Sequence, residues 1–202
     1  MTEHPTWLQL TQDDPGHSHA YVARFRRMAA EGSDLAGEAR LVDAMLPRES
    51  RVLDAGCGPG RVGGWLHGVG HEVVGVDLDP VLIAAAEEDH PGPHWLVADL
   101  ATLDLPSLGI SEPFDAIVCA GNVMAFLESS SRREVLRRFR AHLRPGTGRA
   151  AVGFGAGRAY SFDEFLADAR TAGLEPDLLL SSWHLHPFTA TSDFLVAVLR
   201  PA

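Results

Sequence analysis

Lysine is absent from this sequence of 202 residues, and all 17 of its basic residues are arginine. This absence excludes enzymes that form a Schiff base through lysine and nucleotide-binding proteins that use the lysine of a P-loop. Cysteine is also scarce, with Cys57 in a glycine-rich stretch and Cys119 at the end of an apolar run. Neither has the CxxC or Cys/His spacing of a metal site, so we expect no metal and a reducing, intracellular setting.

Positive charge is in short supply, because the formal net charge is −10 and the pI is about 5.4. Such an acidic chain has no general field that attracts phosphate backbones, so nucleic acid is not expected as a partner. Seven of the 17 arginines do crowd into residues 132–149. Those on the predicted helix lie outside its apolar set, which favours a solvated helix face over an RNA-binding patch.

Long apolar runs are missing too. No stretch is long and apolar enough to span a bilayer, and no positively charged leader precedes an apolar run. We therefore expect a cytoplasmic protein without a membrane partner.

What the sequence does contain is the composition of an ordinary globular protein, 46% hydrophobic and 22% charged, with no interior linker. This predicts a single domain over residues 1–202.

Apolar runs that predict strands alternate with helical patterns along the chain. The first five predicted strands span residues 51–55, 72–77, 94–98, 114–120 and 148–154. Helices are predicted over residues 18–30 and 34–46, and from near Gly60, Pro80, Arg132 and Phe162. The alternation predicts an α/β fold, with a parallel sheet covered by helices on both faces.

Helix starts and the last part of the chain carry further local signals. Asp79 before Pro80 predicts a helix N-cap, and Ser131 with Glu134 and Ser161 with Glu164 have capping-box spacing. Two strand-like runs, 177–185 and 193–199, have no helix between them, which predicts an antiparallel hairpin that closes the sheet.

The strongest functional signal is the segment that runs from a predicted strand through alternate glycines into a helix, Val52-Leu53-Asp54-Ala55-Gly56-Cys57-Gly58-Pro59-Gly60-Arg61. Glycines at such a turn let the backbone approach a ligand closely. The motif does not name its ligand, because Gly58, Gly60 and Gly63 also spell the dinucleotide fingerprint GxGxxG.

Two acidic residues narrow the choice of ligand. Asp77 ends the second predicted strand, where a carboxylate can accept both hydroxyls of a ribose. Its competing role as a helix cap is already filled by Asp79. Asp99 and Leu100 follow the third strand, where the carboxylate and the next backbone N–H could meet an adenine; a plain turn aspartate is the alternative.

In chain order, these segments resemble the successive motifs of class I (Rossmann-like) S-adenosylmethionine (SAM)-dependent methyltransferases: residues 54–60, Val76-Asp77, Ala98-Asp99-Leu100, residues 114–118 and Leu143-Arg144-Pro145-Gly146. The resemblance covers roughly residue 34 to the C-terminus. It implies a seven-stranded, mostly parallel sheet of order 3-2-1-4-5-7-6 whose last strand is antiparallel. The compact spacing resembles the small tellurite-resistance-type (TehB-like) branch.

The resemblance also implies a cofactor site for SAM. The residues implied to border it are Asp54, Gly56, Cys57, Gly58, Gly60, Asp77, Leu78, Asp99, Leu100, Ala120 and Gly121. Asp54 would organise the glycine loop, Asp77 would hold the ribose, and Ala120 and Gly121 would lie beside the sulfonium. Residues 1–33 would form a lid over a core of residues 34–202.

Two departures from the family pattern bear on the substrate. Gly146-Thr147-Gly148 replaces the more usual double glycine, which touches only a distal turn. Ala120-Gly121-Asn122-Val123 stands where enzymes that methylate exocyclic or amide nitrogens have an Asn-Pro-Pro-Tyr type sequence, so DNA bases and glutamine side chains are disfavoured. A small-molecule acceptor is the expectation.

Substrate candidates follow the fourth and fifth strands, because ligands of parallel sheets bind beyond the carboxyl ends of the strands. They are Asn122, Met124, Phe126, Arg158 and Tyr160. Met124 and Phe126 are more often core residues, and Tyr160 is as readily a hydrophobic staple onto Phe165.

No general base is identified by the sequence, because methyl transfer from a sulfonium depends chiefly on alignment. His17, His19 and Tyr21 in the lid segment, and Tyr160, are weak candidates. His184 and His186 share one face of a predicted strand, but lack a third nearby ligand and are better explained as sheet histidines.

Three functions remain open: a small-molecule methyltransferase, a SAM-binding protein without catalysis, and an NAD-dependent oxidoreductase. The intact glycine and aspartate set favours the first. The oxidoreductase would not account for the Arg-Pro-Gly turn or the terminal hairpin.

Overall fold

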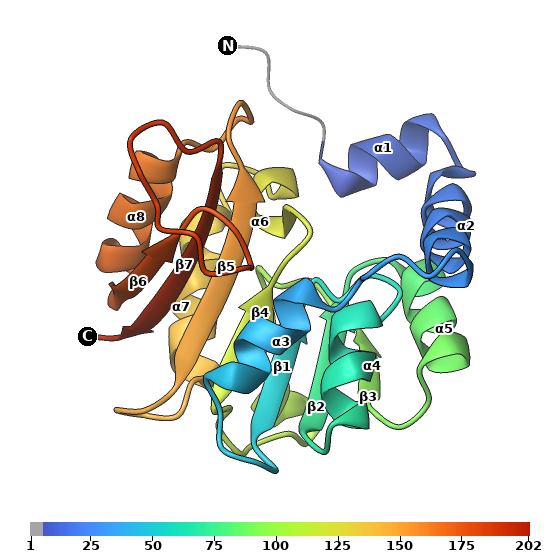
Figure 1. The fold of residues 1–202 in the computed structure, drawn as a ribbon, viewed down its shortest axis with the longest axis horizontal. Coiled ribbons are helices and arrows are strands. Elements are labelled where there is room, and N and C mark those ends of the chain that lie inside the picture. The colour runs from blue at the N-terminus through green and yellow to red at the C-terminus, as the bar shows by residue number, and fades with distance from the viewer. Residues whose placement is uncertain (1–5) are drawn as a thin grey trace.

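The computed structural model of the chain describes residues 6–202. Its strands form one seven-stranded sheet in the order β3-β2-β1-β4-β5-β7-β6 (Figure 1). The strands are β1 (Arg51–Ala55), β2 (Glu72–Asp77), β3 (His94–Val97), β4 (Ala116–Cys119), β5 (Arg149–Gly155), β6 (Leu174–Leu180) and β7 (Phe194–Pro201). The first five pair in parallel, and β7 is antiparallel to β5 and β6, which confirms the predicted order and the reversed last strand.

Helices cover both faces of this sheet, as the alternating pattern predicted. They are α1 (Trp7–Asp13), α2 (His17–Ala30), α3 (Gly37–Ala44), α4 (Arg61–Gly68), α5 (Pro80–Asp89), α6 (Val123–Phe126), α7 (Arg132–His142) and α8 (Phe162–Thr171), with a short 3-10 helix η1 (Leu105–Leu108). None of those in residues 6–202 is long and apolar enough to cross a membrane.

The two faces have separate cores because successive side chains of a strand point to opposite sides. In β1, Val52 is buried against α3 and α4, where it joins Leu41 and Leu66. Its neighbour Leu53 is buried in the other core, with side chains of α7 and α8 such as Phe139 and Phe165. Strands buried on both faces explain why β1, β2 and β4 are nearly continuous apolar runs.

The indole of Trp95 explains three of the glycines. Trp95 lies on β3 beside Gly75 of β2, and a Cβ at Gly75 would come within 2.1 Å of its ring. Cβ atoms at Gly60 and Gly63 would come within 3.0 and 2.9 Å of the same ring. Glycines at these positions therefore let α4 and the edge of the sheet close on Trp95, whose Nε1 donates to the carbonyl of His90 at 3.0 Å.

Of the three predicted helix N-caps, two are confirmed and one is wrong. Asp79 caps α5, because its Oδ1 accepts from the N–H of Val81 at 2.9 Å, and Ser161 and Glu164 form a reciprocal capping box on α8. The box predicted at Ser131 is wrong, since the Ser131 hydroxyl donates to the carbonyl of Glu128 instead.

The sequence reading missed α1, although the local pattern was available. The N-cap of α1 is Thr6, and the side chain of Gln9 completes a capping box with it. Thr-x-x-Gln is a start signal. The helix was overlooked because its surroundings are polar and rich in proline.

The antiparallel hairpin predicted at the end of the chain is confirmed by the pairing of β6 with β7, but the bounds 177–185 predicted for its first strand are wrong. The observed strand β6 begins at Leu174 and contains Pro176, with a register shift between Pro176 and Leu178. Proline breaks a central strand but is tolerated at a sheet edge, which is where β6 lies. His184 and His186 consequently lie in the turn after β6 and are not sheet histidines.

We expect Gly75→Ala to lower the free energy of unfolding by about 3 kcal/mol, the upper end of the usual cost of overpacking, because its Cβ meets the buried indole of Trp95 on the neighbouring strand. Urea unfolding followed by circular dichroism measures this. Gly68→Ala is the matched control, because Gly68 ends α4 with no atom within 4 Å of the added Cβ. Equal stability of the two variants would show that Trp95 does not need the space above Gly75.

Candidate functional site

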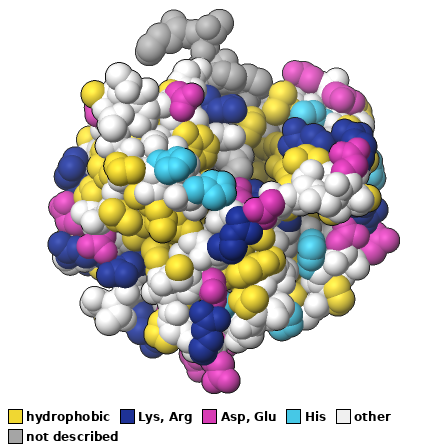
Figure 2. Space-filling view, in the orientation of Figure 1, with side chains coloured by type: hydrophobic (Ala, Val, Ile, Leu, Met, Phe, Trp, Pro, Cys, Tyr) yellow, Lys and Arg dark blue, Asp and Glu magenta, His cyan; other side chains and the backbone are white. Residues whose placement is uncertain are grey.

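A cavity of about 300 Å³ lies at the carboxyl ends of β1, β2 and β4. Its floor comes from the loops that follow these strands, and α1 and α2 contribute a wall over it through Trp7, Leu8, Tyr21 and Phe25. Figure 2 shows hydrophobic side chains reaching into the hollow between α2 and the centre of the molecule. The cavity is therefore a predominantly apolar space with a few carboxylates at its floor and rim, Asp54, Asp77, Asp99 and Glu128.

The glycine loop between β1 and α4 forms the floor. The N–H groups of Gly56 and Cys57 both donate to the carbonyl of Val76, at 2.8 and 3.0 Å, which ties the loop to β2. Gly58 has φ +54°, and the nearest atom to an added Cβ is 3.8 Å away, on the ring of Tyr21. Bare backbone at Gly58 therefore faces open space, as a loop that cradles a ligand requires.

Gly60, which the sequence reading placed beside the cofactor, has a different position. It is not among the residues that line the cavity. Its φ of +81° and its contacts with Ala86 and Trp95 give it a role at the N-cap of α4.

Asp54 organises the start of α4. Its side chain is 2% exposed, and its Oδ2 accepts from the N–H of Gly63 at 2.8 Å. Burial in an apolar setting raises the pKa of this carboxyl to about 7, and the hydrogen bond from Gly63 opposes the rise.

Asp77 joins the end of β2 to the glycine loop. Its Oδ2 accepts from the N–H of Gly58 at 2.9 Å, and its Oδ1 accepts from the N–H of Asp79 at 3.0 Å. Burial raises the pKa of Asp77 to about 6, while the N–H groups of Asp79 and Gly58 hold it lower than burial alone would. Each oxygen keeps a second lone pair, so the carboxylate can accept two more hydroxyls from a ligand in the cavity it lines.

Asp99 and Leu100 line the cavity beyond β3. Asp99 is exposed, and its Oδ1 accepts from the N–H of Ala101 at 2.8 Å in a local turn. Leu100 is 4% exposed and contributes an apolar surface, as do Leu78 and Ala101. Ala120 and Gly121 line the cavity after β4, and an added Cβ at Gly121 would meet no atom within 4 Å.

Cys57 also lines the cavity, but as a buried thiol. Desolvation, together with the charges of Asp54 and Asp77, raises its pKa well above the usual value. The thiol is therefore neutral and poorly nucleophilic at physiological pH.

Of the five substrate candidates, only Phe126 lines the cavity. Asn122 has its Oδ1 bonded to the N–H of Gly155 at 2.8 Å, and Met124 is fully buried in the core. Tyr160 is 2% exposed and donates to Asp168 Oδ2 at 2.9 Å. The structure therefore places Tyr160 with the core aromatics, where its ring packs against Phe165, its expected alternative partner.

Arg158 lies near the cavity without lining it. Its guanidinium sits 5.7 Å from the centre of the Phe126 ring, which does line the cavity.

The three candidates from the N-terminal segment have different surroundings. Tyr21 lines the cavity, and burial raises the pKa of its phenol, with Arg24 and Arg61 opposing the rise. His17 packs edge-on against Trp7, and His19 is exposed; neither lines the cavity.

The sequence reading missed residues that act through tertiary contacts. Trp7 lines the cavity, and its Nε1 donates to Asp79 Oδ2 at 2.8 Å; the Ser18 hydroxyl donates to the same oxygen. Arg61 also lines it, and pairs with Glu38 of α3 at 2.8 Å. Trp7 lies 72 residues before Asp79, and no local pattern links the two.

No group of three or more His, Cys, Asp or Glu residues is placed to hold a metal ion within residues 6–202.

Comparison with known proteins identifies a matching family and a similar solved structure. The methyltransferase domain family matches residues 52–146. A TehB-like SAM-dependent methyltransferase from Corynebacterium glutamicum ATCC 13032 Kitasato is 48% identical, with a TM-score of 0.87 over 94% of this chain and 100% of that one.

Two further relatives are more distant. The malonyl-(acyl-carrier protein) O-methyltransferase of Enterobacter lignolyticus strain SCF1 is 33% identical over 101 residues, which are 46% of this chain and 39% of that protein, so the chain spans well under half of this relative. The 1,6-didemethyltoxoflavin N1-methyltransferase of Burkholderia thailandensis, solved with 1,6-didemethyltoxoflavin and S-adenosylhomocysteine, shares the fold at 22% identity and a TM-score of 0.64, over 92% of this chain and 90% of that one.

Identity at nearly half of the positions along the full corynebacterial chain is far more than a shared fold produces. The chain belongs to the TehB-like branch of the class I SAM-dependent methyltransferases, whose cofactor is S-adenosylmethionine.

Proposed function

We propose that this chain transfers the methyl group of SAM to a small molecule by in-line displacement. The observation that carries the proposal is the pairing of bare backbone at Gly58 with the buried carboxylate of Asp77 at the floor of an apolar cavity. This pairing fits an adenosyl ligand, because a ribose needs a nearby acceptor for its hydroxyls and the rest of the ligand needs close backbone approach.

The lining residues suggest how the cofactor would lie. Asp77 would accept the ribose hydroxyls, and Leu78, Leu100 and Ala101 would hold the adenine between apolar surfaces, with Asp99 at its edge. Gly56 and Gly58 would border the methionine part. Gly121, whose surroundings are open, would lie beside the sulfonium.

When bound, SAM supplies an activated methyl group with a neutral thioether as leaving group. The protein's contribution is to hold the acceptor in line and to exclude water, and alignment alone can lower a barrier by about 7 to 11 kcal/mol. We assign no general base: His17 and His19 lie off the cavity, and the raised pKa of Tyr21 leaves its phenol protonated at neutral pH. A positioning mechanism suits acceptors that are already nucleophilic.

Helices α1 and α2 are proposed to act as the lid. Val22 of α2 packs against Leu82 and Ala85 of α5, and Trp7 contacts Phe126 across the cavity at 6.1 Å between ring centres. Trp7 and Ser18 both donate to Asp79, and these bonds would hold the lid over the cavity.

A small-molecule acceptor is supported by the charge of the chain and by a structural relative. Arginine and acidic side chains are interspersed over the face in Figure 2 without a continuous basic patch. The net charge of −10 opposes binding to nucleic acid. The Burkholderia relative, which has the same fold, is named for methylation of a small heterocycle.

The decisive experiment is to incubate the purified chain with SAM and a metabolite library and to measure S-adenosylhomocysteine. Product formed with one chemical class of acceptor supports the proposal. Retention of SAM in calorimetry without product from any class would favour the alternative of a SAM-binding protein without catalysis. Binding of NAD in place of SAM would contradict both.

We expect Asp77→Ala to weaken binding of SAM by at least about tenfold, because the ribose loses an acceptor and the Gly58 loop loses its anchor. Isothermal titration calorimetry on protein shown to be folded by circular dichroism measures this. Glu87→Ala removes the same charge from an exposed position on α5 that is off the cavity, and should bind SAM as the wild type does. Unchanged affinity in Asp77→Ala would contradict the ribose assignment.

Binding of SAM should weaken as the pH falls from 7 to 5. With a pKa of about 6, Asp77 is ionised above that pH and protonated below it, and a protonated carboxyl has lost acceptor capacity. The loss at pH 5 should reach up to about tenfold for a group that must be ionised. Asp77→Asn should bind more weakly at pH 7 and show a flatter profile, and a profile as steep as that of the wild type would assign the titration to another group.

Replacement of Trp7 tests the lid. Trp7→Ala should speed dissociation of SAM by about tenfold or more, because it removes the contacts with Phe126 and Tyr21 as well as the bond to Asp79. Trp7→Phe keeps an aromatic ring and removes only the N–H donor, so its effect should be smaller. Stopped-flow dissociation measures both rates, and a wild-type rate in Trp7→Ala would show that α1 does not retain the cofactor.

A further inference from the structure

The segment that joins β3 to η1 forms the proposed adenine side of the cavity, through Asp99, Leu100 and Ala101. It lies outside the strands. The N–H of Ala98 donates to the carbonyl of Asp77 at 2.9 Å, which ties the start of the segment to β2. The next bonds are local: Ala101 donates to the Asp99 side chain, and the N–H of Thr102 donates to the Asp99 carbonyl at 3.1 Å. Beyond Ala98, these local turns shape the segment, but they do not fix its position relative to the sheet.

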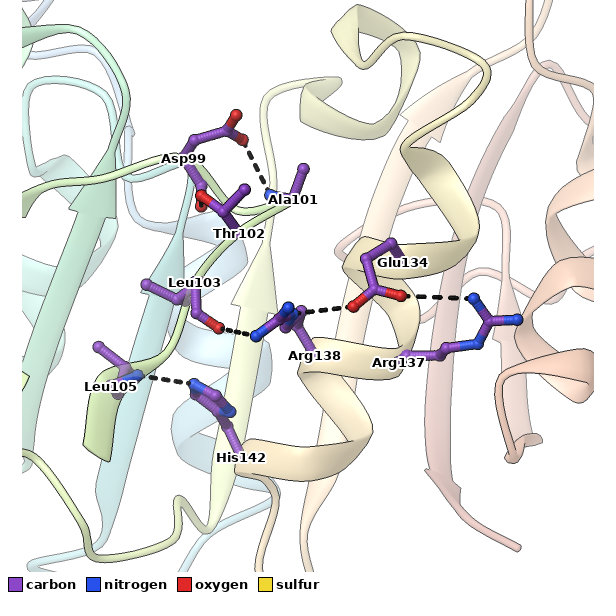
Figure 3. Close-up of polar contacts among 9 residues, drawn as sticks. All are labelled: Asp99, Ala101, Thr102, Leu103, Leu105, Glu134, Arg137, Arg138 and His142. Atoms are coloured by element: carbon purple, nitrogen blue, oxygen red, sulfur yellow. Dashed lines mark hydrogen bonds and ion pairs between the residues drawn. The ribbon is translucent and has the colours of Figure 1, made fainter. Parts of the chain in front are cut away.

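Helix α7 supplies two contacts that do fix this position (Figure 3). Arg138 Nη1 donates to the carbonyl of Leu103 at 3.0 Å. One turn later, His142 Nε2 accepts from the N–H of Leu105 at 3.3 Å. Two polar side chains, four residues apart on one helix face, thus hold both ends of the stretch from Leu103 to Leu105.

The arginine is itself held in place. Glu134, one turn earlier on α7, accepts from Arg138 Nε at 2.9 Å and from Arg137 Nη1 at 3.3 Å (Figure 3). Leu103 and Leu105 are 2% and 1% exposed, so the two backbone groups that α7 contacts lie next to buried side chains. A buried backbone group without a partner is costly, which makes the two contacts selective for one placement of the segment.

We propose that Arg138 and His142 are positioning residues that hold the Asp99–Leu100–Ala101 wall at the distance adenine requires. The proposal rests on the proposed function, because it assumes that adenine occupies this wall. Neither residue lines the cavity, and both act through the backbone of Leu103 and Leu105.

The His142 contact has a defined protonation state. Since the N–H of Leu105 is a donor, Nε2 must be the unprotonated nitrogen, and the ring proton is on Nδ1. Protonation of Nε2 would set two donors against each other and release Leu105. Burial and the positive charge of Arg138 on α7 lower the pKa of His142, and Asp104 of the held segment opposes this, so the contact persists at neutral pH and is lost in acid.

The neighbouring arginines give a matched pair for the first test. Arg137 and Arg138 share the partner Glu134, but only Arg138 reaches the segment. We expect Arg138→Met to weaken binding of S-adenosylhomocysteine by about three- to tenfold in calorimetry, and Arg137→Met to change it less than about twofold. In the protein without ligand, deuterium uptake by residues 99–105 should be faster in Arg138→Met than in Arg137→Met.

The second test uses pH and does not depend on Arg138. In His142→Gln, the side-chain amide oxygen can accept from Leu105 without titrating, so affinity at pH 8 should stay within about twofold of the wild type. Between pH 7 and 5.5 this variant should lose less affinity than the wild type, which isolates His142 from the titration of Asp77. His142→Leu should bind weakly at both pH values.

The outcomes separate the two proposals. A wild-type protein that does not bind S-adenosylhomocysteine would overturn the proposed function and this inference together. If the wild type binds, but Arg138→Met matches Arg137→Met in affinity and in deuterium uptake, or His142→Gln follows the wild-type pH profile, the positioning role is refuted and the methyltransferase assignment stands.

Discussion

The hydrogen bond from the N–H of Gly58 to the carboxylate of Asp77 is the contact on which the site depends. It joins the loop after β1 to the end of β2, so the two parts of the cavity floor move as one. The carboxylate that would recognise the ribose also shapes the loop that would border the methionine. A buried acceptor with two backbone donors is held in one orientation before any ligand arrives, which reduces the ordering cost of binding.

The remaining walls are held differently, because the polar groups that hold their ligand-facing segments do not themselves line the cavity. Asp79 holds α1 and α2 through Trp7 and Ser18. Helix α7 holds the segment after Asp99. The cavity can therefore present a mostly apolar surface while the bonds that set its dimensions lie behind it.

The sheet and most of the residues that line the cavity were predictable because their signals are local and combine in a fixed order. β1 and β2 match the predicted ranges, and most of the residues implied for the cofactor line the cavity. The errors came from context that no window of sequence contains. Pro176 is acceptable only because β6 is an edge strand, and Gly60 packs against Trp95 and does not line the cavity. Tyr160 lies in the core, where its ring packs against Phe165 and its hydroxyl donates to Asp168, eight residues later on α8.

The docking of α2 on α5 has a consequence for biosynthesis. Val22 packs against Leu82 and Ala85, and Arg26 pairs with Glu88 and Asp89, so the helix that α2 docks on emerges from the ribosome some 60 residues after it. An isolated helix of this length is marginal in water. We therefore expect the first two helices to stay largely unstructured until α5 (Pro80–Asp89) has been translated, so that the N-terminal part of the polypeptide folds after residues that follow it in the sequence.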